Sequence, residues 1–297
     1  MILTAIANME ATSMKKFLFL VLAITATAVS ADASLSKEEI LDLLSQERYF
    51  PYQDVTINDE VVAYGVGPDC ASRYDAIKTV LAKYKRPIKV LDIGASNGYF
   101  SLRIAHDFEA LCVMADLSDR LCNICKLNDQ IDGIVYLKRA LSLEDLQALH
   151  ELEHFDVVLA LNVVHHMSPY KEILDMIFKL GDTIIIETPP ANDTRTEENS
   201  DIPLIEQYLL DKQNGTIIAQ TPRAAANNFE KITSLVDTAN HLVQKEYIPG
   251  AYAKMFCFEN MVSLDVTPTF NIATYRLLNG VFPLIEKEDE AVLSIHP

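Results

Sequence analysis

The sequence predicts an α/β fold with a mostly parallel sheet. A mainly apolar run, residues 88–93, follows Pro87 and leads directly into a loop bounded by Gly94 and Gly98. Apolar residues then recur at helical spacing, at Phe100 and Ile104. Downstream, short apolar runs alternate with helical patterns, which indicates parallel strands joined by right-handed helical crossovers.

The elements follow in order along the chain. Strands are expected at 88–93, 110–115, 133–138, 155–161 and 182–188, and helices at 71–84, 99–105, 119–128, 142–152 and 170–180. Segments 242–248 and 254–259, joined by Pro249 to Tyr252, predict a terminal antiparallel hairpin. Together they predict a Rossmann-like sheet.

The loop after the first of these strands limits the classes of ligand that could bind there. A dinucleotide site needs three glycines spaced as G-x-G-x-x-G, whereas here three residues separate Gly94 from Gly98 and the middle glycine is missing. Asp92 precedes Gly94 by two positions, where its charge suits a cation better than a phosphate. A plain tight turn closed by this aspartate is the alternative.

The pattern D-x-G-x-x-x-G resembles the first motif of the class I S-adenosylmethionine-dependent methyltransferases. The resemblance covers roughly residues 60–260 and implies S-adenosylmethionine as cofactor, on a methyltransferase sheet. It implies that the loop, with Gly94, Asn97 and Gly98, surrounds the methionine part, and that Asp92 lies near the ammonium group.

Two further polar residues follow later strands. Asp116 lies about 20 residues beyond the glycine loop, where a Rossmann-type site places the acid that binds ribose hydroxyls. Its alternative is a helix cap, by Asp116 or Ser118. The resemblance carries Asn162 to contact with the methionine moiety, although a short amide there could equally cap the strand end.

Candidate catalytic groups follow the fourth strand. His165 and His166 lie in a segment that, in similar methyltransferases, faces cofactor and acceptor. A histidine titrates near neutrality and can accept the proton of an attacking hydroxyl or amine, so either ring is a candidate general base. The alternative is methyl transfer by proximity and desolvation alone. Glu187 is expected either in the substrate cleft or in solvent, and Arg73 either at the cofactor carboxylate or exposed.

Charge bears on the acceptor. The net charge is −17, with 42 acidic against 25 basic residues, which disfavours a nucleic-acid partner. Residues 162–165 read Asn-Val-Val-His, unlike the Asn/Asp-Pro-Pro-aromatic signature of nucleic-acid amine methyltransferases.

Cys122 and Cys125 lack companions at zinc spacing, so no metal is expected. We expect a small-molecule or carbohydrate-like acceptor, methylated at oxygen. The competing function is a non-catalytic cofactor-binding or secreted interaction protein.

Sequence patterns outside the predicted sheet indicate further segments at both ends of the chain. Residues 1–31 resemble an extension plus signal peptide, because Lys15 and Lys16 precede the apolar run 17–29 and small residues end it. Export is therefore expected, and an uncleaved anchor with a cytosolic domain is the alternative; membrane contact is expected only through this segment. Residues 32–86 are expected to form a helical segment with a glycine-containing lid loop, 87–260 the main domain, and 261–297 a cap or tail. An insertion, 191–241, is expected to build the acceptor pocket.

Overall fold

The computed structural model describes residues 51–190 apart from Val66, Arg86 and several positions between 119 and 132, and also 201–212, 214–224, 236–237, 242–243 and 247–259. The predicted signal segment and the C-terminal cap lie outside the described residues. So does most of the predicted helix at 119–128.

A seven-stranded sheet organises the described part of the chain. Its strand order is β5-β4-β3-β6-β7-β11-β8. The strands are β3 (Lys89–Ile93), β4 (Leu111–Asp116), β5 (Ile134–Lys138), β6 (Phe155–Leu161), β7 (Gly181–Thr188), β8 (Gly215–Ala224) and β11 (Tyr247–Glu259). Strands β5 to β7 in this order are parallel neighbours, and β11 runs antiparallel to both β7 and β8. The predicted fold class, a mostly parallel sheet with an antiparallel hairpin, is confirmed.

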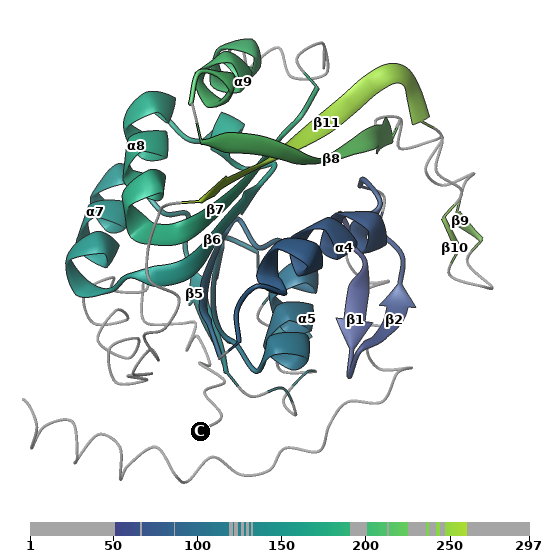
Figure 1. Ribbon diagram of the computed structural model, residues 1–297. Helices are drawn as coiled ribbons and strands as arrows, with labels where there is room; N and C mark the ends of the chain where they lie inside the picture. Colours follow the sequence, from purple (N-terminus) through teal and green to yellow (C-terminus); the bar gives the residue numbers. More distant parts are fainter. Residues whose placement is uncertain are drawn as a thin grey trace, which may run out of the picture. The chain divides into compact units, whose positions relative to one another are not determined.

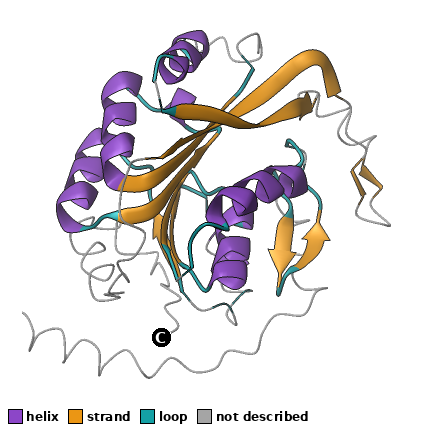
Figure 2. Ribbon diagram, in the orientation of Figure 1, coloured by secondary structure: helices purple, strands orange, loops and turns teal. Residues whose placement is uncertain are grey.

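Helices cover both faces of this sheet (Figures 1 and 2). On one face lie α4 (Cys70–Leu81) and α5 (Tyr99–Phe108), and on the other lie α7 (Leu143–Leu152), α8 (Tyr170–Leu180) and α9 (Ile202–Leu210). Each face buries its own apolar cluster. Because both faces are covered, β3 and β6 are buried along their whole lengths, which explains their nearly continuous apolar sequences.

Element boundaries agree closely where the sequence pattern was strong. The strand at 155–161 and the helix at 170–180 have the predicted limits. Helix α7 begins one residue after Ser142, whose hydroxyl accepts from the Asp145 N–H while the Asp145 carboxylate accepts from the Ser142 N–H. This reciprocal capping box fixes the helix start. Helix α4 is shorter than predicted and ends at Leu81.

The predicted hairpin of 242–248 with 254–259 is wrong in its partners. Residues 254–259 belong to β11, which pairs with β7 and with β8, a strand inside the segment taken as an insertion. Pro249 and Gly250 lie within β11, in a stretch where the register with β8 is interrupted. A proline and a glycine are accommodated in a strand at such an irregularity.

Two smaller differences concern the flanking segments. The 32–86 segment contains a β-hairpin, β1 (Val55–Ile57) and β2 (Glu60–Ala63), in addition to α4. Its turn residues Asn58 and Asp59 both have positive φ, which suits a two-residue hairpin turn. Near the end of the segment expected as an insertion, β9 (Val236–Asp237) pairs antiparallel with β10 (Leu242–Val243).

Candidate functional site

The glycine loop joins β3 to α5 at the carboxyl edge of the sheet. Gly94 and Gly98 have φ of 72° and 75°, a region that favours glycine. A Cβ on Gly94 would lie 2.5 Å from Val163 Cγ2, so the loop packs against the segment that follows β6. The structure therefore brings the loop and the residues around Asn162 together.

The backbone of this loop is poorly suited to a pyrophosphate. The N–H groups of Gly94 and Ala95 donate to the Ala115 carbonyl, at 2.8 and 3.2 Å, and that of Gly98 donates to Ala95. The Ser96 N–H donates to Asp116. Anion sites at helix N-termini depend on N–H groups that point at the ligand, and these four are already used within the protein. The loop geometry supports the exclusion of a dinucleotide.

Asp92 lies at the end of β3 and is buried. Its Oδ2 accepts a hydrogen bond of 2.7 Å from the Ser101 hydroxyl. Burial raises the pKa of Asp92 to about 7, the Ser101 hydrogen bond opposes this rise, and the charge of Asp116 adds to it. A nearby positive charge would stabilise the ionised form of this buried carboxyl group, so the position favours the binding of a cationic group.

Asp116 ends β4 and is half-buried. One carboxylate oxygen accepts from the Ser96 N–H and the other from the Ser118 N–H, both at 2.8 Å. The carboxylate is thus fixed beside the glycine loop. Each oxygen has a second lone pair, so the group can still accept hydroxyl hydrogen bonds. The local turn to Ser118 and the predicted ribose role are therefore compatible.

A buried polar cluster lies where β6 and β7 end. Arg73 Nη2 and Asn162 Nδ2 both donate to Glu187 Oε2, and Thr221 Oγ1 donates to Glu187 Oε1 at 3.3 Å. Arg73 and Glu187 are 1% and 0% exposed. The expectations of an exposed arginine and a solvated glutamate are therefore wrong. Helix α4 packs directly over this sheet edge, and the sequence pattern around Arg73 gave no sign of its partner, which is 114 residues away.

Asn97 has a role that the sequence did not indicate. Its side-chain amide donates to the Gln53 carbonyl at 2.8 Å, and the Gln53 side chain accepts from the Tyr99 N–H at the start of α5. The lid loop joins the same segment, because Gly65 N donates to Asp54 and Gly67 N to Tyr52. Residues 52–54 thus form hydrogen bonds with both the glycine loop and the lid loop. Contact of Asn97 with the cofactor stays a prediction.

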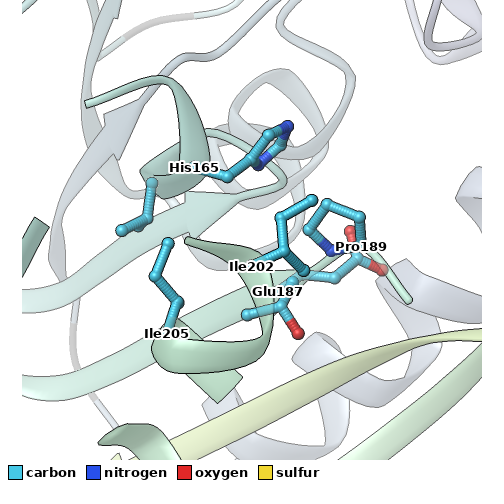
Figure 3. A pocket seen from close by; sticks show the side chains of 7 residues that line it. His165, Glu187, Pro189, Ile202 and Ile205 are labelled. Carbon is cyan, nitrogen blue, oxygen red and sulfur yellow. The ribbon is translucent and has the colours of Figure 1, made fainter. Parts of the chain in front are cut away.

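The two histidines follow β6 in a 3₁₀ turn, η1 (Val164–His166). Their ring centroids are 3.9 Å apart. His165 is half-buried and lines a small recess, whereas His166 is exposed. Figure 3 shows this recess, with Pro189 after β7 and the α9 side chains Ile202 and Ile205 around it. The structure thus distinguishes the two rings, which the sequence did not.

Among the described residues, no group of three or more His, Cys, Asp or Glu side chains is arranged to hold a metal ion. Within the same residues, no helix combines the length and apolarity needed to cross a membrane.

Comparisons with known proteins agree with this geometry. A family model described as a methyltransferase domain matches residues 90–180, which contain the glycine loop, Asp116 and both histidines. The O-antigen chain terminator bifunctional methyltransferase/kinase WbdD of Escherichia coli is 28% identical over 130 residues, 40% of this chain and 18% of the relative. The chain thus matches less than a fifth of that relative's length.

A solved structure of WbdD has the same fold. A WbdD co-crystal structure with a kinase inhibitor superposes with a TM-score of 0.51 at 20% identity, covering 78% of this chain and 50% of WbdD. The N-terminal domain of EvdMO1 with SAH bound has a TM-score of 0.49 at 11% identity, covering 76% of this chain and 98% of that domain.

The loop pattern, the acid at the end of β4, the strand order and the matched domain model point to one family. The donors and acceptors at the strand edge fit a cofactor that has an amino-acid end and a ribose. Residues 90–180 thus form a methyltransferase domain, and the fold and site around them agree with a class I S-adenosylmethionine-dependent methyltransferase.

Proposed function

We propose that this methyltransferase acts on an oxygen of a small-molecule or carbohydrate-like acceptor. S-adenosylmethionine supplies an electrophilic methyl group, so the protein must place an acceptor oxygen beside it and remove one proton. The observation that carries the proposal is the recess beside the strand edge, which brings His165 together with the hydroxyl-bearing Thr188.

The recess is lined by both polar and apolar side chains. It is narrow in this structure, so an acceptor group would enter it only after the side chains around it move apart. Thr188 Oγ1 is buried and has no hydrogen-bond partner among the described residues. Because β7 alternates its faces, Thr188 projects to the same side as Ile186, the side covered by α8 and α9. A hydroxyl of the acceptor would form a hydrogen bond with Thr188 Oγ1. Ile202 and Ile205 would contact an apolar part of the acceptor.

His165 is the proposed general base. His165 follows Asn162, which belongs to the buried polar cluster, and Val163, which packs against the glycine loop. It therefore lies close in the sequence to residues that are expected to bind the cofactor. An imidazole can take a proton from a hydroxyl during its attack. His166 is exposed and is the weaker candidate.

Two further observations support a small acceptor. The net charge of −17 opposes binding to a phosphate backbone. The matched relative is named an O-antigen chain terminator bifunctional methyltransferase/kinase.

A product assay tests the proposal. The parent protein is incubated with S-adenosylmethionine and a panel of hydroxyl-bearing sugars and small molecules, and S-adenosylhomocysteine release is measured. The methylated atom of any product is then located by NMR. An O-methylated small molecule is the expected result. Cofactor binding without turnover on any class of acceptor would instead favour the non-catalytic function, and methylation of nitrogen or of RNA would contradict the proposed acceptor.

A further inference from the structure

An ion pair between β11 and α9 lies next to the recess that contains His165 and Thr188. In this pair, Lys254 Nζ donates to Glu206 Oε1. Glu206 directly follows Ile205, which lines the recess, so α9 brings both an apolar and a charged side chain to this place. The side chains of Lys254 and Glu206 are 31% and 12% exposed. The pair is therefore accessible from solvent.

The strand register places Lys254 beside Thr188. These two residues are direct Cα partners in the antiparallel pairing of β11 with β7. Side chains of directly opposite residues project from the same face of a sheet, with Cβ atoms about 4.5–5.5 Å apart. This face is the one covered by α8 and α9, because Phe256, two residues after Lys254, belongs to the same apolar cluster as Ile186. Thr188, Lys254 and Glu206 therefore gather on one face of the sheet.

Thr188 has hydrogen-bonding capacity that the described residues leave unused. The residue is 2% exposed, and its Oγ1 is buried and has no hydrogen-bond partner among the described residues. Most buried polar side-chain atoms have a partner, so this atom indicates a place for a ligand group. An ammonium has three donors and a carboxylate has several acceptor positions, so the bond between Lys254 and Glu206 leaves both groups able to bind a ligand.

The chemistry of these three side chains identifies the groups that they would bind. Thr188 can donate and accept, Lys254 only donates, and an ionised Glu206 only accepts. A hydroxyl both donates and accepts, so hydroxyls on neighbouring carbons can form hydrogen bonds with all three side chains. The two opposite charges of the ion pair offset each other, which favours a neutral ligand over an anionic one. A saturated ring with several hydroxyls fits this combination better than a phenol, whose single hydroxyl is the atom to be methylated.

We infer that the acceptor is a neutral, sugar-like polyol whose hydroxyls next to the methylated oxygen bind Thr188 and the Lys254–Glu206 pair. This inference rests on the proposed function and specifies its acceptor class further. Thr188 and the ion pair determine which acceptor binds, whereas His165 acts on the hydroxyl that is methylated. An acceptor without the neighbouring hydroxyl leaves polar groups of the protein unpaired, so the site should reject it.

Matched acceptors test this inference in the parent protein. Methyl glycosides of hexoses and pentoses, their monodeoxy analogues and simple phenols are compared by S-adenosylhomocysteine release and product NMR. At least one glycoside should be O-methylated, and removal of a hydroxyl next to the methylated oxygen should lower kcat/KM about tenfold or more. O-methylation of phenols alone, or equal kcat/KM for a glycoside and its deoxy analogue, would overturn the inference while the proposed function stands. No O-methylated product from any acceptor would overturn both.

Thr188→Val assigns the effect to the hydroxyl, because valine has nearly the same shape as threonine. The value of kcat/KM for the glycoside should fall about tenfold, and the preference for the glycoside over its deoxy analogue should shrink by about the same factor. Thr188→Ser should retain most of both values. A lower rate with an unchanged preference would show a merely structural role and remove Thr188 from acceptor recognition.

The ion pair is tested by removing both charges together. Lys254→Met with Glu206→Gln leaves no unpaired charge behind. The KM for the glycoside should rise about tenfold, while kcat and S-adenosylmethionine affinity should change less than about threefold. An unchanged KM would remove the pair from acceptor binding.

Lys89 and Glu153 provide a matched control for this double variant. They also form an ion pair, with side chains 10% and 13% exposed, but Lys89 begins β3 and so lies at the opposite edge of the sheet. Lys89→Met with Glu153→Gln should leave the KM for the glycoside unchanged. Equal increases in KM for the two double variants would show a general effect of charge removal and contradict the assignment of Lys254 and Glu206.

Discussion

Single residues at the carboxyl edge of β3 and β4 make up the predicted cofactor site, and their local sequence was sufficient to predict that they lie together at this edge. Asp92, Gly94, Gly98 and Asp116 lie in short segments with a recognisable order of strand, turn and helix. The side-chain partners of Arg73, Glu187 and Asn97 could not be found in this way, because each pairs with a residue distant in the sequence. Burial of an arginine depends on which helix covers which strand, and no local sequence pattern predicts that arrangement.

Gly94→Ala should weaken cofactor binding. The residue has a φ of 72°, and its new Cβ would lie 2.5 Å from Val163 Cγ2. We expect a loss of about 1–3 kcal/mol in the free energy of unfolding and at least about a tenfold loss in S-adenosylmethionine affinity by calorimetry.

Gly133→Ala is the matched control for this strain. Gly133 has a φ of 82°, and its Cβ would lie 2.4 Å from the Ala110 carbonyl oxygen, at the start of β5. It should lower stability as well but leave cofactor affinity unchanged. The interpretation of the loop is wrong if the two variants bind equally well.

Asp92→Asn should alter the pH dependence of stability. Burial raises the pKa of Asp92 from 3.8 to about 7, so between these values the unfolded chain has released the proton that the folded chain keeps. The parent therefore loses stability as pH rises through this window, whereas an asparagine does not. Relative to the parent, the variant should gain on the order of 1–4 kcal/mol between pH 4 and 7. Urea unfolding at several pH values checks this, and parallel curves would contradict the assigned burial effect.

His165→Ala and His166→Ala should differ. If the half-buried His165 is the base, its removal should lower turnover by about a hundredfold or more without changing cofactor affinity. Replacement of the exposed His166 should change turnover by less than about threefold. Both are measured by S-adenosylhomocysteine release with the acceptor found in the panel. Unchanged turnover in both variants would exclude histidine base catalysis.

At the scale of elements, strands and helices with strong periodicity were predictable and the hairpin was not. β6 and α8 have continuous or amphipathic patterns that only one secondary structure satisfies. β8 begins at the glycine of an Asn-Gly turn signal, but it is an edge strand in which Ile217 is 42% exposed and Pro222 interrupts the pattern. Its partner β11 is more than twenty residues later, and pairing over that distance is set by the sheet and not by local sequence.

Ser142→Ala tests a local element independently of the site. The Ser142 hydroxyl caps α7, on the sheet face opposite α4 and α5. Loss of the cap should lower the free energy of unfolding by about 1 kcal/mol and leave S-adenosylmethionine affinity at the parental value. Chemical denaturation and calorimetry on the same preparation provide both numbers. A change in cofactor affinity would show that α7 and the site are coupled, contrary to their separation here.

At the scale of the whole molecule, strand order explains why these residues meet. The chain places β3 next to both β4 and β6, so the loops after these parallel strands gather at one edge. The ligand site of a doubly wound sheet lies where the strand order reverses, and here that point is between β3 and β6. Alternation of strands and helices made this topology predictable, and it accounts for the convergence of the glycine loop, Asp116 and Asn162.

The central claim is that this edge binds S-adenosylmethionine through the glycine loop and Asp116. Calorimetric titration of the cofactor into the parent protein and into Asp116→Ala tests it most directly. The account predicts saturable binding by the parent and at least about a tenfold loss in the variant, because the carboxylate both fixes the loop and accepts hydroxyl hydrogen bonds. Absence of binding by the folded parent, or equal affinity in the variant, would contradict it.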